Sequence, residues 1–186
     1  MQMLRSWLAG AAAATALLSS TSASAAFIGF EDFGNVGTSG PVVTNQYAAQ
    51  GVVFSSTPGE GNQVSSQAGL SDGLNFICTG NGSIDCTGET ILTFASGASG
   101  LSFLAVGSNS PGVQALVDVY VNNAFAATQG ITVGGNANVP GLVDLSAYND
   151  ITSIRIYDIT DPAGLGWDDF SFKTAALVVA RRQRRG

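Results

Sequence analysis

Histidine is absent from this sequence of 186 residues, and its absence excludes several kinds of active site. Ser-His-Asp and Cys-His catalysis need an imidazole base, and many zinc sites need imidazole ligands. Basic residues are also scarce, because the segment from Phe27 to Lys173 holds only Arg155 and Lys173 against 13 acidic residues, a net charge of 2 − 13 = −11. This charge disfavours nucleic acid and anionic membranes as partners, and it is compatible with divalent cations or a neutral ligand such as a sugar.

The sequence also lacks an apolar run long enough to predict a membrane span in the mature protein. The apolar stretch at residues 7–18 is shorter than the ~20 residues that cross a bilayer, which argues against the alternative of a membrane anchor. Arg5 precedes this stretch and Ala23-Ser24-Ala25 follows it, in the order of a secretory signal with its cleavage site. We therefore predict a signal peptide over residues 1–26 and export to the cell surface or the extracellular space, with the periplasm as the alternative.

Cysteine occurs only twice, at Cys78 and Cys86. In an exported protein this close spacing predicts one local disulfide that pins the intervening loop.

The sequence is rich in glycine, with 24 residues, and short stretches of alternating polar and apolar residues recur along it. Such stretches separated by turn residues predict β-strands, and no segment between them has a convincing helical period. We predict an all-β fold, an antiparallel jelly-roll-like β-sandwich of about eight to ten short strands, formed by one domain over residues 27–173. The expected strands are residues 27–33, 52–54, 90–94, 101–106, 115–121, 124–128, 142–145, 152–158 and 164–172.

Three connections follow from the turn residues. Residues 96–100 are expected to form a hairpin connection between the strands on either side. Asn122-Asn123 suits a type I′ turn, because asparagine tolerates positive φ. The polar, glycine-rich segment 57–75 has no periodicity and is expected to be a loop.

Two acidic pairs occur beside aromatic residues in the first and last expected strands. Glu31 and Asp32 belong to the first strand, and Asp168 and Asp169 begin the last one. If these strands pair, the four acids gather at one end of the sandwich and can supply oxygen ligands for a structural calcium ion. The alternative is that some of them simply point into solvent.

In the last strand, strict alternation places Phe170 and Phe172 on one face and Trp167, Asp169 and Ser171 on the other.

Several motifs occur together in this chain: Phe30-Glu31-Asp32-Phe33, Asn45-Gln46-Tyr47-Ala48 and Gly166-Trp167-Asp168-Asp169-Phe170-Ser171-Phe172. In this combination the chain resembles the exported β-sandwich domains of bacterial proteins that carry the PEP-CTERM sorting signal. Those domains are similar to galactose-binding and carbohydrate-binding jelly rolls. The resemblance implies a structural calcium that joins an N-terminal acid, Glu31 or Asp32, to Asp168 or Asp169.

The C-terminal residues 174–186 contain a short apolar segment followed by four arginines. They lack the Pro-Glu-Pro motif and the full-length helix of that sorting signal. We interpret them as a degenerate remnant or a solvated tail, and free secretion is the simpler expectation.

Three functions remain open after these observations. The first is a structural or matrix role outside the cell without a discrete ligand. The second is calcium-dependent, lectin-like binding of an extracellular polysaccharide, with Trp167, Tyr157 and Arg155 as the candidate binding residues and a core position as the alternative for Trp167. The third, a glycan-active enzyme, is disfavoured because adjacent aspartates on one strand point to opposite faces and no catalytic residues can be assigned. The protein is therefore expected not to be an enzyme.

Overall fold

The computed structural model describes residues 24–70, 73–80 and 85–174. These residues contain strands and two short 3-10 helices but no α-helix, and none of their helices could span a membrane. In chain order the elements are β1 (Ser24–Ile28), η1 (Glu31–Phe33), η2 (Ala48–Gln50), β2 (Val52–Ser56), β3 (Gly61–Ser66), β4 (Asn75–Gly80), β5 (Thr90–Val106), β6 (Pro111–Val121), β7 (Ala124–Gly134), β8 (Gly141–Asp144), β9 (Ile151–Tyr157) and β10 (Gly166–Thr174).

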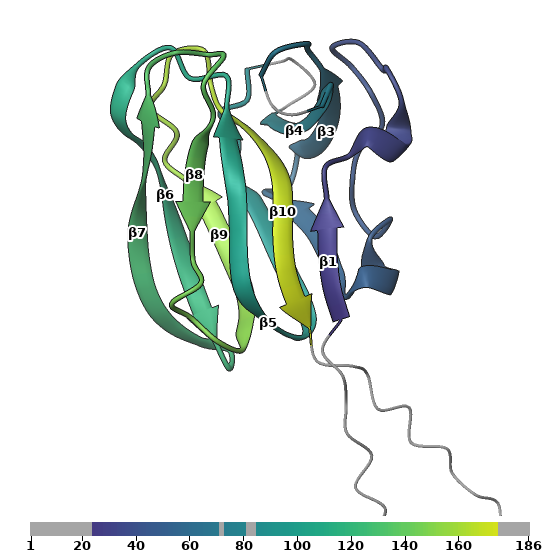
Figure 1. Ribbon diagram of the computed structural model, residues 1–186, viewed down its shortest axis with the longest axis vertical. Coiled ribbons are helices and arrows are strands. Elements are labelled where there is room, and N and C mark those ends of the chain that lie inside the picture. The colour runs from purple at the N-terminus through teal and green to yellow at the C-terminus, as the bar shows by residue number, and fades with distance from the viewer. Residues whose placement is uncertain (1–23, 71–72, 81–84, 175–186) are drawn as a thin grey trace, which may run out of the picture.

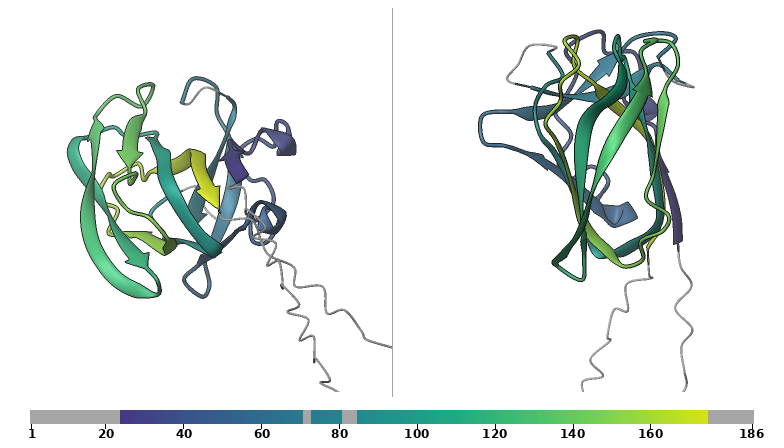
Figure 2. Two further views of the ribbon diagram at one scale, coloured as in Figure 1. Left: turned by 60° about the horizontal axis from the view of Figure 1, so that its bottom comes forward. Right: turned by 90° about the vertical axis from the view of Figure 1, so that its left-hand side faces the viewer.

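The strands form an antiparallel β-sandwich, as predicted (Figures 1 and 2). One layer contains β2, the first part of β5, β9, β6 and β7, and the other contains β3, β4, β1, β10, the last part of β5 and β8. The two layers enclose a core that includes Phe54, Phe103, Phe170 and Ile154. Ring contacts link the two layers, since Phe170 packs against both Phe54 and Phe103.

Strand β5 belongs to both layers, and here the hairpin predicted at residues 96–100 is wrong. Residues 90–93 pair with β9 and residues 102–105 pair with β8, within one continuous strand of 17 residues. Gly97 and Gly100 have φ values of 75° and 64°, which non-glycine residues rarely adopt. These glycines let the strand bend from one layer into the other instead of reversing its direction.

Two further expectations differ from the structure. Segment 57–75 is not wholly a loop, because its residues 61–66 form β3 and pair with β4. The first expected strand ends at Ile28 rather than Phe33, because Phe30 has a φ of 59° and the chain turns there into η1. By contrast, the Asn122-Asn123 turn is confirmed, with φ values of 49° and 63° at the β6–β7 hairpin.

The first and last strands pair, with Ile28 opposite Phe170 and Ser24 opposite Thr174. Strand β1 therefore begins inside the predicted signal peptide of residues 1–26, whose first 23 residues lie outside the described part. Residues 175–186 of the C-terminal segment also lie outside it. The predicted disulfide is present, and it joins Cys78 in β4 to Cys86.

Candidate functional site

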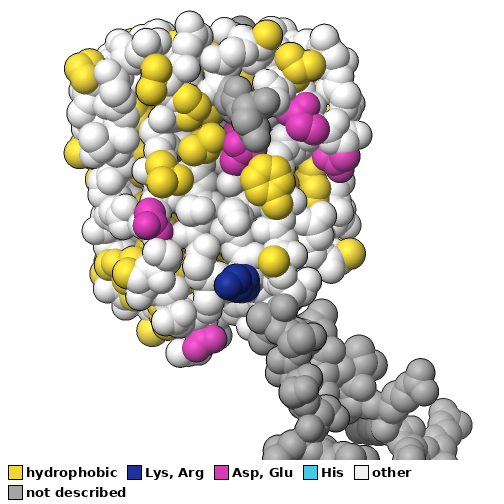
Figure 3. All heavy atoms as spheres, in the orientation of Figure 1, with side chains coloured by type: hydrophobic (Ala, Val, Ile, Leu, Met, Phe, Trp, Pro, Cys, Tyr) yellow, Lys and Arg dark blue, Asp and Glu magenta, His cyan; other side chains and the backbone are white. Residues whose placement is uncertain are grey.

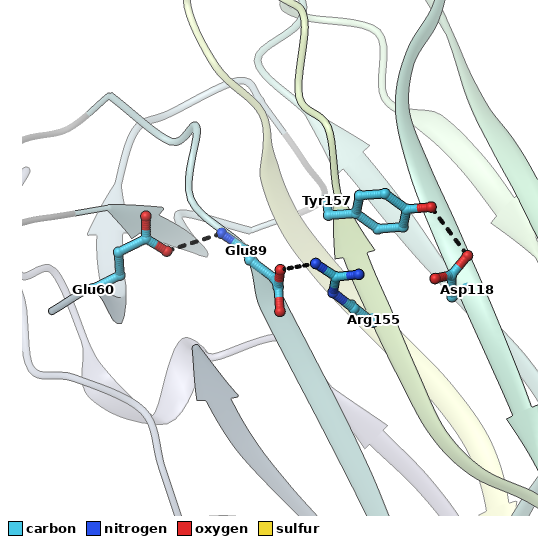
Figure 4. Close-up of polar contacts among 5 residues, drawn as sticks. All are labelled: Glu60, Glu89, Asp118, Arg155 and Tyr157. Atoms are coloured by element: carbon cyan, nitrogen blue, oxygen red, sulfur yellow. Dashed lines mark hydrogen bonds and ion pairs between the residues drawn. The ribbon is translucent and has the colours of Figure 1, made fainter. Parts of the chain in front are cut away.

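Strand β9 carries two of the predicted binding residues on its outward face. Ile154 and Ile156 are fully buried in the core, whereas Arg155 and Tyr157 between and after them are partly exposed. Residues two apart on a strand share a face, so these two side chains meet above the sheet. The Arg155 guanidinium carbon lies 4.4 Å from the centre of the Tyr157 ring, a cation–π contact that holds both planar groups in place (Figure 4).

The neighbouring strand β6 supplies a carboxylate to this pair. Asp118 lies opposite Arg155 in the β6–β9 register, and its side chain is only 7% exposed. Its Oδ1 atom accepts hydrogen bonds from the Thr128 hydroxyl at 2.6 Å and from the Tyr157 hydroxyl at 3.2 Å. Burial, reinforced by the charge of Asp118, raises the pKa of Tyr157, so the phenol stays protonated and can donate this bond.

On its other side, Arg155 is fixed by an ion pair. Its Nη2 atom donates to Glu89 Oε2 at 2.6 Å, and this hydrogen bond raises the pKa of the guanidinium. Glu89 is held in turn, because its backbone amide donates to Glu60 Oε2 at 3.1 Å (Figure 4). We call the group formed by Glu89, Arg155, Tyr157, Asp118 and Thr128 the β9 face.

The surface around the β9 face continues with aromatic and hydroxyl groups. Tyr120 lies opposite Ser153 and contacts Phe125 edge to face at 5.9 Å, and Phe125 is 59% exposed. Rings fixed by neighbours, next to planar polar groups, can contact the apolar face of a sugar and hydrogen-bond its hydroxyls. Asp118 and Glu89 each accept a hydrogen bond from a neighbouring side chain, which fixes the position of both carboxylates.

Sequence reasoning identified Arg155 and Tyr157, but it did not connect them with Asp118. The missing information was the register between β6 and β9, which no local pattern reveals. Glu89 and Thr128 carried no signal in the sequence.

Trp167, the third predicted binding residue, lies in the core. Its side chain is 0% exposed and packs edge to face against Phe103. The predicted alternation is wrong at this point, because a bulge at Asp169, with φ 52°, adds one residue to β10. Trp167 and Phe170 therefore lie on the same, inner side, and the alternative of a core position for Trp167 is the one observed.

The predicted calcium ligands have different hydrogen-bond partners in the structure. Glu31 Oε1 accepts the backbone amides of Leu74 and Asn75, both at 2.8 Å. Asp32 Oδ1 accepts the Tyr47 hydroxyl at 2.6 Å. On β10, Asp168 is 0% exposed and its Oδ1 accepts the amide of Asp169.

Two of these acids, Asp32 and Asp168, lie close enough to Tyr47 for their charges to raise its pKa. Burial raises the pKa of Tyr47 strongly, and the hydrogen bond to Asp32 and the charges of Asp32 and Asp168 raise it further. The face that carries β1, β10 and β8 shows acidic side chains at several separate places, with some of them toward its upper right (Figure 3).

Within the described residues, no group of three or more acidic, cysteine or histidine side chains is arranged to hold a metal ion. Calcium takes six to eight oxygen ligands, so the acids present would have to be completed by backbone carbonyls and water. The calcium site stays a prediction. Within it, Asp32 and Asp168 are the two acids whose charges both act on Tyr47.

No protein-family model matches the chain, and no curated protein has a similar sequence. Among solved structures, the chain is similar to a family 35 carbohydrate binding module from an environmental isolate, with 11% identity and a TM-score of 0.35, over 81% of this chain and 98% of that one. The resemblance to PEP-CTERM-associated domains stays a prediction.

Proposed function

We propose that this protein is an exported, non-catalytic β-sandwich that binds neutral extracellular glycans through the β9 face. One observation carries the proposal: the Tyr157 ring is held above an open sheet by Arg155 stacking and by a hydrogen bond to Asp118. Such a ring loses little conformational freedom when a ligand contacts it, which favours binding.

The charge of the chain selects the class of glycan. The segment from Phe27 to Lys173 carries a net charge of −11, so an acidic polysaccharide would be repelled over most of the surface. Arg155 does not offset this, because its charge is paired with Glu89. A neutral polysaccharide avoids the repulsion and still uses the hydroxyl, carboxylate and guanidinium groups as hydrogen-bond partners.

Two observations support export. The disulfide Cys78–Cys86 is of a kind that persists in oxidising compartments, and the N-terminal sequence has the order of a secretory signal. Sequencing the N-terminus of protein recovered from the culture medium or the periplasm tests this part directly. A start at Met1 would contradict it.

The binding part is tested on a glycan array that contains neutral polysaccharides such as amylose, xylan and galactan, together with acidic polygalacturonate. We expect binding to one or more neutral glycans, and about tenfold weaker binding by Tyr157→Ala, which loses an aromatic contact. Tyr157→Phe keeps the ring but loses the bond to Asp118, so its loss should be smaller.

Phe27→Ala provides the matched control. Phe27 is an aromatic residue on the other layer and is 60% exposed, so its removal should leave glycan binding unchanged. Thermal unfolding of each variant shows whether a loss of binding reflects loss of the fold. If no glycan binds, or if Tyr157→Ala binds as well as the wild type, the proposal is wrong and the structural or matrix role is preferred.

A further inference from the structure

A pocket of about 310 Å³ opens on a different part of the molecule from the β9 face. It is bounded by β3, by the start of β4, by the segment after β5 and by the turn before β10. None of its lining residues belongs to the β9 face. Its volume lies at the lower end of the range of small-molecule sites, about 300–1,000 Å³.

The base of the pocket is apolar. Leu70, Phe76 and Val106 belong to a small hydrophobic cluster, separate from the main core, that also contains the disulfide. Phe76 is 6% exposed, so its ring is held by packing and presents a limited surface to the pocket. A ligand seated here needs one apolar face.

The rim of the pocket is polar but uncharged. Thr38, Gln67 and Asn109 contribute to it, and all three are exposed. Among the described residues, the side-chain amides of Gln67 and Asn109 have no hydrogen-bond partner, so both remain available to a ligand. The hydroxyls of Ser65 and Ser66 are already committed, to the Thr38 carbonyl and to Asn75.

Among the residues that the structure describes, no charged side chain lines the pocket, although the segment from Phe27 to Lys173 is strongly acidic. The carboxylate of Asp161 lies behind the rim, where it is 1% exposed and accepts the backbone amides of Asn109 and Ser110. These bonds fix the segment that carries Asn109. The described lining of the pocket therefore offers no charged side chain that would pair with an ionised ligand.

We infer that this pocket is a second, independent binding site for one neutral sugar ring. A pyranose has an apolar face of C–H groups that fits against Phe76, and hydroxyls at its edge that fit the amides of Gln67 and Asn109. A charged sugar would lose hydration without finding a counter-ion. The inference does not depend on the glycan proposal, because the two sites share no residue.

The test is an NMR titration of the isotope-labelled protein with methyl glycosides of glucose, galactose, mannose and N-acetylglucosamine, and with glucuronate and glucosamine as charged controls. We expect at least one neutral glycoside to shift the backbone signals of Gln67, Phe76 and Asn109, and the charged sugars to leave them unchanged. The double substitution Gln67→Ala and Asn109→Ala should weaken binding about tenfold, the effect of losing two hydrogen bonds.

Gln50→Ala with Asn149→Ala is the matched control, since it removes exposed amides that do not line the pocket. Ala163→Phe tests the site by another route, because Ala163 lies exposed at the rim and a phenyl group there would block entry. Binding that survives Ala163→Phe, or the absence of any neutral-sugar shift at these signals, would overturn the inference. Tyr157→Ala should leave these shifts unchanged. The experiment can therefore reject sugar binding in the pocket without rejecting glycan binding on the β9 face, and the reverse.

Discussion

Strands β9 and β10 both carry predicted binding residues, and they differ in where the regular pleat is interrupted. In β9 a register shift lies at its start, between Ile151 and Ser153, and the pleat is regular from there on, so Ile154 and Ile156 are buried whereas Arg155 and Tyr157 face outward. In β10 the bulge at Asp169 inserts a residue, and Trp167 joins Phe170 on the inner side. Alternation along a strand thus predicts side-chain direction only as far as the next bulge.

The polar groups of the two regions are also used differently. On the β9 face, side chains bond to side chains of other strands, as Asp118 does to Thr128 and Tyr157. Around β10, the carboxylates of Glu31 and Asp168 accept hydrogen bonds from backbone amides. The first pattern leaves outward-facing groups for a ligand, whereas the second fixes the path of the chain.

The largest expected difference in the free energy of unfolding is between alanine variants of Trp167 and Tyr157. Trp167→Ala leaves a cavity in the core and should lower the free energy of unfolding by about 3–5 kcal/mol. Tyr157→Ala, at a partly exposed position, should cost about 1 kcal/mol. Guanidinium unfolding of both variants measures this contrast, and equal costs would place the Trp167 ring outside the core.

The predicted calcium site sharpens the comparison between two of the buried aspartates, Asp118 near β9 and Asp168 in β10. Calcium at about 100 times its dissociation constant should raise the free energy of unfolding by about 2.7 kcal/mol, and a chelator should reverse the change. Asp168→Asn should abolish this response and Asp118→Asn should keep it, because only Asp168 lies at the acidic end. Identical melting curves in calcium and in chelator would show that no such ion stabilises the fold.

The disulfide belongs to the β10 side of the comparison, because β4 pairs with β10 where Ile77 lies opposite Trp167. Replacing Cys78 and Cys86 by serine should lower the free energy of unfolding by about 2–3 kcal/mol, since the bond closes a short loop. Chemical reduction of the wild type should lower its melting temperature similarly. Detection of two reactive thiols in the exported protein would contradict the disulfide.

The smallest expected change in the free energy of unfolding concerns Tyr47 and Tyr157, whose hydroxyls donate hydrogen bonds to carboxylates. Loss of the hydroxyl in Tyr47→Phe should cost about 0.5–1.5 kcal/mol near neutral pH. The pKa of Tyr47 is raised above the ordinary value of 10.0, so its contribution is complete below pH 10.0 and declines as the pH rises further.

Denaturant midpoints between pH 7 and pH 11 should therefore fall less steeply for Tyr47→Phe than for the wild type. Tyr157→Phe is the comparator, and its effect should be smaller because the Tyr157 ring is partly exposed. An alkaline slope that Tyr47→Phe leaves unchanged would mean that another group causes it.

The sequence was sufficient for the fold class, because strands such as β6 and β9 alternate clearly and their turns contain residues suited to positive φ. It was not sufficient for β3, whose residues are largely polar and which is a strand because it pairs with β4. Propensity alone cannot predict such a strand, since partner and burial decide it.

Only part of the β9 face could be predicted, because the rest depends on how the strands pair. Arg155 and Tyr157 are neighbours along one strand, so a local pattern identifies them together. Asp118 and Glu89 reach Arg155 only through the pairing of β9 with β6 and β5, which depends on the whole sheet. The pocket at Phe76 was not predicted at all, because its walls come from segments far apart in the chain.

Strand β5, which belongs to both layers, determines how this protein unfolds. Because one uninterrupted strand supplies hydrogen bonds to both layers, neither layer can separate without breaking pairs that hold the other. Amide hydrogens in β9 and in β10 should then exchange with solvent through the same global opening, with equal protection, rather than as two independent units. Because Gly97 and Gly100 let β5 continue through the bend, the two layers are expected to unfold as one cooperative unit.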